Sequence, residues 1–488
     1  MALWPAGLGE QDRPGWAFCR YEDVMESVLD KKYHFIGIGG IGTSGLAKLL
    51  IRHGATVSGS DMSDSTLMQE LAGKGITISV GHKADNVPSD ADAVIISAAI
   101  PATNPELTRA GEKGKKIYKY AEMLGKVFDQ FSGIAVCGTH GKSTTSAWTA
   151  YILEKAGLNP SFIIGADIPQ LGGSSGVGAS NWFVAEACEY DRSFLNLHPQ
   201  IACMLNIEAD HLDYYRDEDE IVDAFADFSR NIRPSGVLVA NGRDRNVARV
   251  LRRGGLNAKV VTYGLDLGCQ YTAINPDLVD GLYHFDIYYN GKLFGRTHIA
   301  LPGLHNVENA LAVTAILAEA GLPPQRICEL LPGFTGTDRR LMFKGKVRDI
   351  TVMDDYAHHP TEVRASLAGI RQRYQPKRLW CVFQPHQYSR TRFLLDDFAE
   401  SFKLADITIV PEIYFVRDTA ESKSKVNAET LVQRIQKTGS QALFLNDFGG
   451  ILDHLKENVQ PGDLVVTMGA GTIWKVADEY LCWLGQHN

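Results

Sequence analysis

A short glycine-rich segment between an apolar run and a helical pattern constrains this chain more than any other feature. The run Ile134–Cys137 leads into Gly138, Thr139, His140, Gly141, Lys142, Ser143 and Thr144, and a helical pattern continues to Ala156. Such a strand–loop–helix unit directs backbone N–H groups, a lysine ammonium and a serine hydroxyl toward phosphate oxygens and Mg²⁺. The spacing is compressed, because Val136 stands where the full phosphate-loop pattern has its first glycine. The alternative interpretation is a loop that contains Gly-Lys-Ser by chance and binds no phosphate.

A second glycine cluster lies near the start of the chain. The apolar run Tyr33–Ile38 ends in this cluster, which opens a helical pattern and contains Gly37, Gly39, Gly40, Gly42 and Ser44. Glycines let the backbone approach a pyrophosphate, and an acid about 20 residues on, here Asp61, can meet a ribose or a base. A nicotinamide dehydrogenase uses this pattern, and a tight turn that binds nothing also fits it.

Short apolar runs alternate with helical patterns along the whole chain, which predicts parallel sheets with crossover helices. At roughly 150 residues per domain, the 488 residues predict about three domains. We place them at 1–122, 123–334 and 335–488, with a turn-rich linker at Pro332–Asp338.

Three local patterns add detail to this organisation. Period-two alternation on both sides of Asn290 and Gly291 predicts a hairpin in the second domain. A single helix is expected at Thr391–Phe402 in the third domain, and Tyr21–Leu29 is a candidate N-terminal helix.

Composition narrows the function classes. Lys and Arg number 49 against 57 Asp and Glu, a formal net charge of −8, so nucleic acid is not an expected partner. The chain has no apolar run of about 18 residues and no signal-peptide pattern. Eight scattered Cys residues without a CxxC pair fit reduced thiols. We therefore expect a cytoplasmic protein that is not bound to a membrane and that binds anions through local devices.

Polar side chains follow two predicted strands of the second domain. Glu186 comes directly after an apolar run, and His211 follows the next run along the chain. A carboxylate at a strand end beside a phosphate loop suits a metal ion. A histidine taken in isolation is more often structural than a ligand.

Further polar residues stand at a helix start, after the linker and at strand ends. Asn306 and Asn309 share a helical face, where they could read a purine ring or cap the helix. Arg339 and Arg340 could reach a phosphate or form a solvated basic pair. In open parallel sheets ligands bind at strand carboxyl ends, which in the third domain carry Asp355, Tyr356, His358 and Arg390.

Together these motifs resemble those of the Mur ligase family. Ten occur in the family's order between Tyr33 and Trp474: HFIGIGGIGTSG, SGSD, ISAAIP, GTHGKST, AEACEYDRSF, NIEADHLDYY, LPGLHNVENALA, DDYAHHPTE, FQPHQYSRTR and GAGTI. The resemblance implies an α/β fold of three domains. These are an N-terminal Rossmann-like domain for a UDP-sugar, a central P-loop-type ATPase domain with a mainly parallel sheet, and a C-terminal Rossmann-like domain for an amino acid.

The resemblance also implies an activity. It is the ATP-dependent ligation of L-alanine to the lactoyl carboxylate of UDP-N-acetylmuramate through an acyl phosphate, a step of peptidoglycan and cell-wall synthesis. ATP is then a co-substrate, and Mg²⁺ or Mn²⁺ is the cofactor. The first glycine cluster would bind the pyrophosphate of the UDP-sugar, and the protein would be a monomer or a weak homodimer.

By the same resemblance, each matching residue receives a role. The catalytic residues are Lys142, Glu186, His211, His358 and Arg390. The metal ligands are Ser143, Glu186 and His211, and the amino acid is bound by Tyr356, His358 and Arg390. The UDP-sugar is bound by Gly37, Gly39, Gly40, Gly42, Ser44, Asp61, Ser97, His140 and Ser193. ATP is bound by Gly138, Thr139, His140, Gly141, Lys142, Ser143, Thr144, His305, Asn306, Asn309, Arg340 and Asp355.

Two departures from the family pattern leave alternatives open. The family's EADESD reads here EACEYD, with Cys188 and Tyr190 altered, and Gln387 replaces the first arginine of HRYTRT. The EYD triplet and the DDYAHHP motif also resemble those of a related ligase, which attaches a recycled tripeptide to the same sugar. Outside this class, the alternatives are a nicotinamide dehydrogenase and a non-catalytic nucleotide-binding protein.

Overall fold

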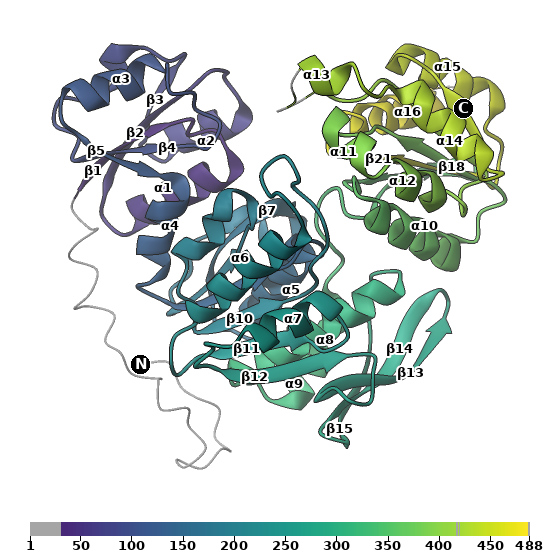
Figure 1. Ribbon diagram of the computed structural model, residues 1–488, viewed down its shortest axis with the longest axis horizontal. Coiled ribbons are helices and arrows are strands. Elements are labelled where there is room, and N and C mark those ends of the chain that lie inside the picture. Colours follow the sequence, from purple (N-terminus) through teal and green to yellow (C-terminus); the bar gives the residue numbers. More distant parts are fainter. Residues whose placement is uncertain (1–30, 416–417, 419, 487–488) are drawn as a thin grey trace.

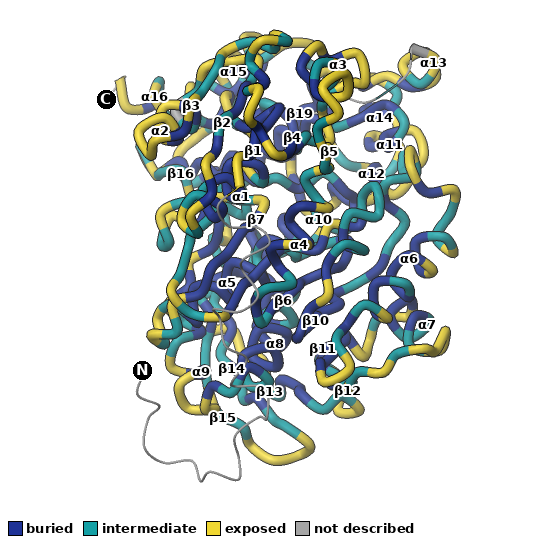
Figure 2. The backbone as a smooth tube through the Cα atoms, turned by 90° about the vertical axis from the view of Figure 1, so that its left-hand side faces the viewer, coloured by how far each residue is buried: buried dark blue, intermediate teal, exposed yellow. Residues whose placement is uncertain are grey.

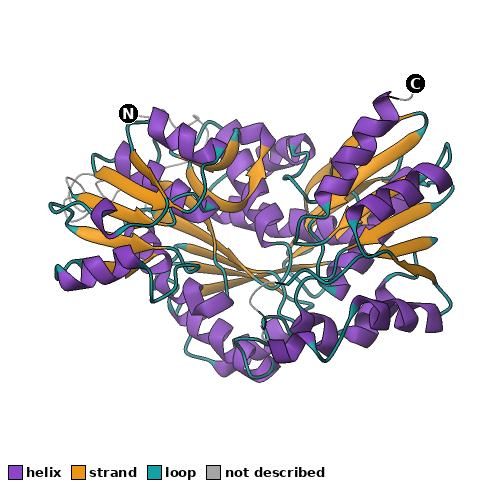
Figure 3. Cartoon of the chain, turned by 90° about the horizontal axis from the view of Figure 1, so that it is seen from above, coloured by secondary structure: helices purple, strands orange, loops and turns teal. Residues whose placement is uncertain are grey.

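Three sheets follow one another along the residues that the structure describes (Figure 1). The structure is a computed structural model, and it describes residues 31–415, 418 and 420–486. The candidate helix at Tyr21–Leu29 lies outside them. Helices flank each group of strands, as Figure 3 shows from above. The expected α/β fold with three sheets is confirmed.

The N-terminal sheet is parallel and has the strand order β3-β2-β1-β4-β5. Its strands are β1 Lys32–Ile36, β2 Thr56–Asp61, β3 Thr77–Val80, β4 Ala93–Ile96 and β5 Lys116–Lys119. Its helices are α1 Ile41–Arg52, α2 Thr66–Gly73, the 3₁₀ helix η3 Ala84–Asn86 and α3 Pro105–Glu112, and α4 Tyr120–Phe128 follows. The order reverses at β1, so the first glycine cluster lies at the switch point where such sheets bind ligands.

The middle sheet is mixed, with the order β15-β14-β13-β12-β11-β10-β6-β9-β7-β8. The strands are β6 Ser132–Cys137, β7 Ser161–Ile168, β8 Gly173–Gly176, β9 Trp182–Glu186, β10 Ile201–Met204, β11 Val237–Asn241, β12 Lys259–Gly264, β13 Tyr271–Val279, β14 Leu282–Tyr289 and β15 Lys292–His298. The helices are α5 Lys142–Lys155, η4 Pro169–Leu171, η5 Tyr190–Asn196, α6 Glu218–Arg230, α7 Arg245–Arg253, α8 Leu304–Glu319, α9 Pro324–Leu330 and η6 Leu331–Gly333. The strands from β12 to β7 pair in parallel, and the predicted hairpin at Asn290 joins β14 to β15.

Helices α5 and α8 are buried along most of their length (Figure 2). They pack on each other and on the middle sheet, and Trp148 of α5 stacks on Phe334 with ring centroids 5.3 Å apart. This packing fixes the start of α5, which carries the phosphate loop.

The C-terminal sheet has the order β16-β17-β21-β18-β19-β20, with β16 antiparallel to its neighbour. The strands are β16 Met342–Val347, β17 Ile350–Asp355, β18 Leu379–Phe383, β19 Ile407–Val410, β20 Gln441–Phe444 and β21 Leu464–Met468. The helices are α10 Pro360–Tyr374, α11 Tyr388–Phe393, α12 Leu395–Ser401, α13 Ala420–Lys423, α14 Ala428–Lys437, α15 Phe448–Asn458 and α16 Trp474–Gln486.

One expected helix of this domain is wrong. Thr391–Phe402 is not a single helix, because α11 ends at Phe393 and α12 begins at Leu395. Leu394 between them has φ −108° and ψ 22°, outside the α-helical range. The chain therefore changes direction at Leu394, directly after the helix that carries Arg390.

The middle and C-terminal domains touch at the linker and at the β13–β14 hairpin. At the tip of the β13–β14 hairpin, a side chain on Gly281 would collide with the backbone of Arg373 in α10. Tyr283 donates a hydrogen bond of 3.2 Å to Gln372, and the Asp338 N–H donates to the Asp167 carbonyl at 2.9 Å. None of the helices in the described ranges is long and apolar enough to cross a membrane.

Candidate active site

The phosphate loop connects β6 to α5 at the carboxyl edge of the middle sheet. Gly138 and Gly141 have φ values of +138° and +85°, which side chains disfavour. A Cβ atom on Gly141 would lie 2.9 Å from Oδ1 of Asn309. The loop therefore has a shape that requires glycine, and Ser143 and Thr144 occupy the first turn of α5, where backbone N–H groups have no helical acceptor.

Lys142 is held at the mouth of this loop. Its Nζ donates to the carbonyl of Thr139 at 3.1 Å and to Oε1 of Glu189 at 3.0 Å. Burial alone would lower the pKa of Lys142, but the Glu189 carboxylate outweighs it and raises that pKa. The ammonium is therefore fully charged at neutral pH, the state in which it can pair with a phosphate.

Acidic oxygens gather beside Lys142. Glu189 is 3% exposed, and its Oε2 makes no hydrogen bond with the described residues. Nε2 of His211 lies 3.7 Å from Oε1 of Glu189. Glu186, at the end of β9, accepts a 2.7 Å hydrogen bond from the Gly165 N–H. The partnerless carboxylate oxygen and the Glu186 carboxylate fit a hard cation such as Mg²⁺ or Mn²⁺.

A cavity of about 500 Å³ opens between the middle and C-terminal domains. Eight of the residues expected to bind ATP line it: His140, Gly141, Thr144, His305, Asn306, Asn309, Arg340 and Asp355. The other four expected residues, Gly138, Thr139, Lys142 and Ser143, belong to the adjoining loop but do not line the cavity. Sequence reasoning missed further lining residues, among them Asn241, Arg243, Asp244, Tyr263, Leu265 and Leu301.

The two asparagines lie inside helix α8. Asn306 donates to the Pro302 carbonyl at 2.7 Å, and Asn309 donates to Oδ1 of Asn306 at 3.0 Å. The N-cap of α8 is Gly303, without a side-chain hydrogen bond, so the capping interpretation is wrong. Burial lowers the pKa of His305 to about 4, so its ring is neutral at neutral pH.

The two arginines after the linker make different contacts. Arg340 lines the cavity, with Nη1 3.6 Å from Oε1 of Glu362 and its guanidinium 5.0 Å above the Tyr356 ring. Arg339 instead pairs with Asp354 at 3.0 Å and donates to the Gly469 carbonyl at 2.6 Å. Only Arg340 of the pair is therefore placed to meet a phosphate in the cavity.

The residues expected to bind the amino acid form one group in the C-terminal domain. Nδ1 of His358 is 3.0 Å from the Tyr356 carbonyl, and burial lowers the pKa of His358 to about 3. His386, which sequence reasoning missed, lies 6.0 Å from the His358 ring and 3.2 Å from Arg390. Arg390 also donates to Oδ1 of Asp210 at 2.7 and 3.1 Å, which brings this group to the residue preceding His211.

The first glycine cluster forms a closed loop in the N-terminal domain. The Gly39 N–H donates to Oδ2 of Asp61 at 2.9 Å, and a Cβ atom on Gly37 would lie 3.0 Å from Cβ of Ser97. A Cβ atom on Gly42 would lie 2.6 Å from the Tyr120 hydroxyl, a contact that the sequence did not reveal.

The remaining residues expected at the UDP-sugar lie in different surroundings. Gly40 is the N-cap of α1, and Ser44 is buried in the first turn. Ser193 belongs to η5 of the middle domain, which Lys119 of the N-terminal domain contacts through a 3.0 Å ion pair with Asp191. The His140 ring faces the C-terminal domain, where its Nδ1 lies 3.2 Å from Glu362.

Comparison with known proteins accounts for all three domains. The model of the Mur ligase family, catalytic domain, matches residues 32–132, the Mur ligase middle domain matches 136–317, and the Mur ligase, glutamate ligase domain matches 339–471. The chain belongs to the Mur ligase family. The dehydrogenase alternative is thereby excluded.

Relatives of this Mur ligase span nearly its full length. A UDP-N-acetylmuramate–L-alanine ligase of Acetivibrio thermocellus is 42% identical over 93% of this chain and 97% of its own. One of Caldanaerobacter subterraneus is also 42% identical, over 94% and 99%. Among solved structures, the UDP-N-acetylmuramate–alanine ligase of Thermotoga maritima aligns with a TM-score of 0.78 at 27% identity, over 94% and 100% of the two chains. A murein peptide ligase of Psychrobacter arcticus aligns with a TM-score of 0.68 at 25% identity, over 94% and 99%.

Proposed function

We propose that this chain joins L-alanine to the lactoyl carboxylate of UDP-N-acetylmuramate at the expense of ATP, in peptidoglycan synthesis. Besides membership of the family, one observation in the structure supports this proposal. The Asp210–Arg390 contact brings the amino-acid group of the C-terminal domain beside His211 and the acidic side of the phosphate loop. A nucleotide and an amine donor can thus meet at one place.

The proposed chemistry has two steps. The carboxylate attacks the γ-phosphorus of ATP, ADP leaves, and an acyl phosphate forms. The amine of alanine then attacks the acyl carbon and loses a proton, and phosphate leaves with the C–O electron pair. Lys142 and Arg340 stabilise the charge on the transferred phosphoryl group. We propose that Ser143, Glu186 and His211 hold Mg²⁺ or Mn²⁺, which when bound neutralises phosphate charge.

The other ligands are proposed from the same placement. The UDP-sugar pyrophosphate would meet the N–H groups of the loop at Gly37–Gly42 and the first turn of α1, with Ser97, Ser193 and His140 as further contacts. The alanine carboxylate would pair with Arg390, whose planar guanidinium suits bidentate binding. Because Asp210 already occupies one edge of that guanidinium, alanine must share or displace this contact.

L-Alanine is preferred over a tripeptide as the amine donor. The full-length relatives at 42% identity carry the name of the alanine enzyme, and the solved alanine ligase aligns with a higher TM-score than the solved murein peptide ligase. We also propose that the domains span residues 1–122, 123–334 and 335–488. The protein is proposed to be cytoplasmic and to be a monomer or a weak homodimer.

The test is phosphate release with UDP-N-acetylmuramate, ATP and a panel of amines. We expect release with L-alanine, less with serine and glycine, and none with L-alanyl-γ-D-glutamyl-diaminopimelate. Release with the tripeptide alone would assign the tripeptide activity instead. ADP formation that depends on neither the sugar nor an amine would contradict the ligase itself.

A further inference from the structure

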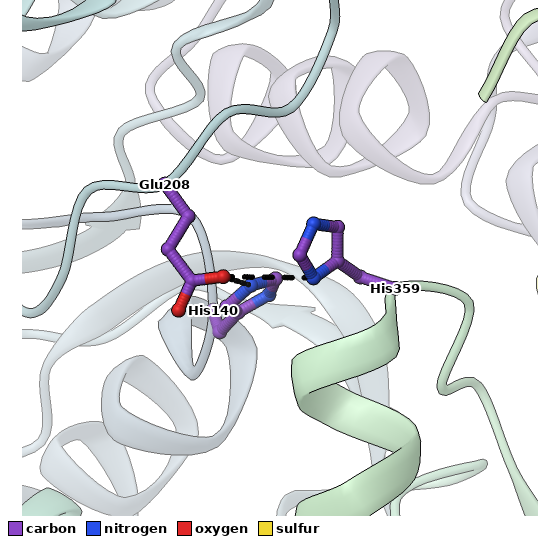
Figure 4. Close-up of side chains that lie close together, drawn as sticks. All are labelled: His140, Glu208 and His359. Carbon is purple, nitrogen blue, oxygen red and sulfur yellow. Dashed lines mark ion pairs between the residues drawn. The ribbon is translucent and has the colours of Figure 1, made fainter. Parts of the chain in front are cut away.

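Two histidines and a glutamate meet where the middle and C-terminal domains touch (Figure 4). His140 belongs to the phosphate loop, Glu208 follows β10, and His359 is the N-cap of α10. One nitrogen of each ring and one carboxylate oxygen all lie within 4.8 Å of one another. Oε2 of Glu208 is 3.5 Å from Nε2 of His140 and 3.7 Å from Nδ1 of His359.

We propose that these three side chains form a binding site for a transition-metal ion, Zn²⁺ in the first place, distinct from the magnesium site of the ligase reaction. Tetrahedral zinc with ligands at 2.0–2.2 Å separates neighbouring ligand atoms by about 3.3–3.6 Å. The two measured separations from Glu208 lie close to this spacing. Three protein ligands leave the fourth position open, as in many zinc sites.

An unpaired ring nitrogen of His140 supports the site. Nε2 of His140 is buried and makes no hydrogen bond with the described residues. The His359 nitrogen that faces Glu208 is Nδ1, which accepts a 3.3 Å hydrogen bond from the Thr361 N–H. A buried polar atom without a partner costs free energy, so such atoms are uncommon. For His140 the open nitrogen is the one that faces Glu208.

Surrounding groups orient two of the proposed ligands. Nδ1 of His140 lies 3.2 Å from Oε1 of Glu362, which can accept the Nδ1 proton. Burial alone would lower the pKa of His140, but Glu208 and Glu362 outweigh it and raise that pKa to about 9, so a metal ion must displace the proton on Nε2. The Thr361 hydroxyl donates to Oε2 of Glu208 at 2.7 Å and fixes that carboxylate. A histidine supported by a carboxylate is the usual arrangement behind a zinc ligand.

The donor set selects the metal. Two imidazoles and one carboxylate suit Zn²⁺, Ni²⁺ or Cu²⁺, whereas Mg²⁺ prefers oxygen ligands. The ligands come from both domains, so a bound ion would clamp them together and fix His140 in the phosphate loop. Binding of Zn²⁺ should therefore slow turnover.

The test titrates the full chain, treated with a chelator and free of substrates, with Zn²⁺ by calorimetry. The variant His359→Asn removes one ligand and keeps a good N-cap for α10. Loss of an outer-shell partner weakens metal binding 10–100-fold, so loss of this ligand should weaken it by about 100-fold or more. Glu208→Gln provides a second variant should the first fail to fold.

A matched control addresses adventitious binding. His284 and His298 stack with ring centroids 4.8 Å apart on β14 and β15, and His284→Asn should leave the main binding event unchanged. A large excess of Mg²⁺ should not displace the Zn²⁺, and bound Co²⁺ should show no thiolate charge-transfer band. Equal Zn²⁺ affinity in wild type and both site variants, displacement by Mg²⁺, or a thiolate band would each overturn the proposal. Because no substrate is present, these results do not depend on the ligase activity.

Discussion

A buried carboxylate in the N-terminal domain offers the sharpest test of the physical reasoning. Glu106 of α3 is fully buried, with Oε2 2.9 Å from Nε2 of His34 and accepting a 2.7 Å hydrogen bond from Ser60. Its Oε1 accepts from the Asn86 amide at 2.7 Å and from the Lys83 N–H at 3.1 Å. The perturbation is Glu106→Gln, which keeps the shape but turns one acceptor into a donor.

The magnitude follows from two routes. Burial alone would raise the pKa of Glu106, but its hydrogen bonds lower it from 4.5 to about 2. At 1.36 kcal/mol per tenfold change, this difference corresponds to about 3 kcal/mol of stabilisation at neutral pH. Independently, an amide NH₂ at the position of Oε1 would face the Asn86 and Lys83 donors, and each buried donor left unpaired costs about 1–3 kcal/mol. Both routes predict a loss of about 3 kcal/mol.

Hydrogen exchange at pH 7 measures this loss locally. Peptides covering β1 and β2 should exchange about 100-fold faster in Glu106→Gln, while peptides covering β17 and β18 should not change. Glu112→Gln is the matched control on the same helix, because its side chain is 60% exposed and should contribute little. Equal protection in Glu106→Gln and wild type, or an equal effect of Glu112→Gln, would refute the reasoning.

The pH dependence has a definite sign. Because the folded-state pKa of Glu106 is depressed, its stabilisation is present above about pH 4.5 and is lost as the pH falls toward 2. The stability difference between wild type and Glu106→Gln should therefore shrink to less than half at pH 3.

Three further outcomes are expected from enzyme kinetics and binding. Lys142→Ala should lower kcat by about 100-fold or more, because the substitution removes the positive charge proposed to stabilise the transferred phosphoryl group. Unchanged phosphate release would show that Lys142 does not stabilise that group. Arg390→Lys should raise the KM for L-alanine by about tenfold while kcat changes less, whereas Arg392→Lys, on an exposed neighbour, should change neither. Gly42→Ala should weaken UDP-sugar binding in calorimetry, because the added methyl collides with the Tyr120 hydroxyl; undiminished affinity would mean that the loop adapts.

Local sequence patterns were sufficient to predict those features that depend on residues close together in the sequence. The two glycine loops, the hairpin at Asn290 and the alternating strands follow from sequence separations of a few residues, so they could be predicted. The edge strand β16 was missed because its residues, Met342–Val347, include lysines and a glycine rather than an apolar run. The break at Leu394 was missed because an apolar period runs across it.

Contacts between distant segments could not be predicted from such patterns. Asp210 and Arg390 are 180 positions apart, and His140 and Glu362 are 222 apart. Glu189 was visible as part of an altered motif, but only packing reveals that it holds Lys142. Tyr120 belongs to no recognisable motif, and only the structure reveals that its hydroxyl lies against Gly42.

The β13–β14 hairpin has a mechanical consequence. The middle domain meets the C-terminal domain through the covalent linker beside Asp338 and again through the hairpin tip at Gly281, which abuts Arg373. A body held at two separate points keeps only the rotation about the line that joins them. While both attachments persist, the C-terminal domain can swing in one direction but cannot twist freely. Each closing movement would then return Arg390 to the same partner, Asp210.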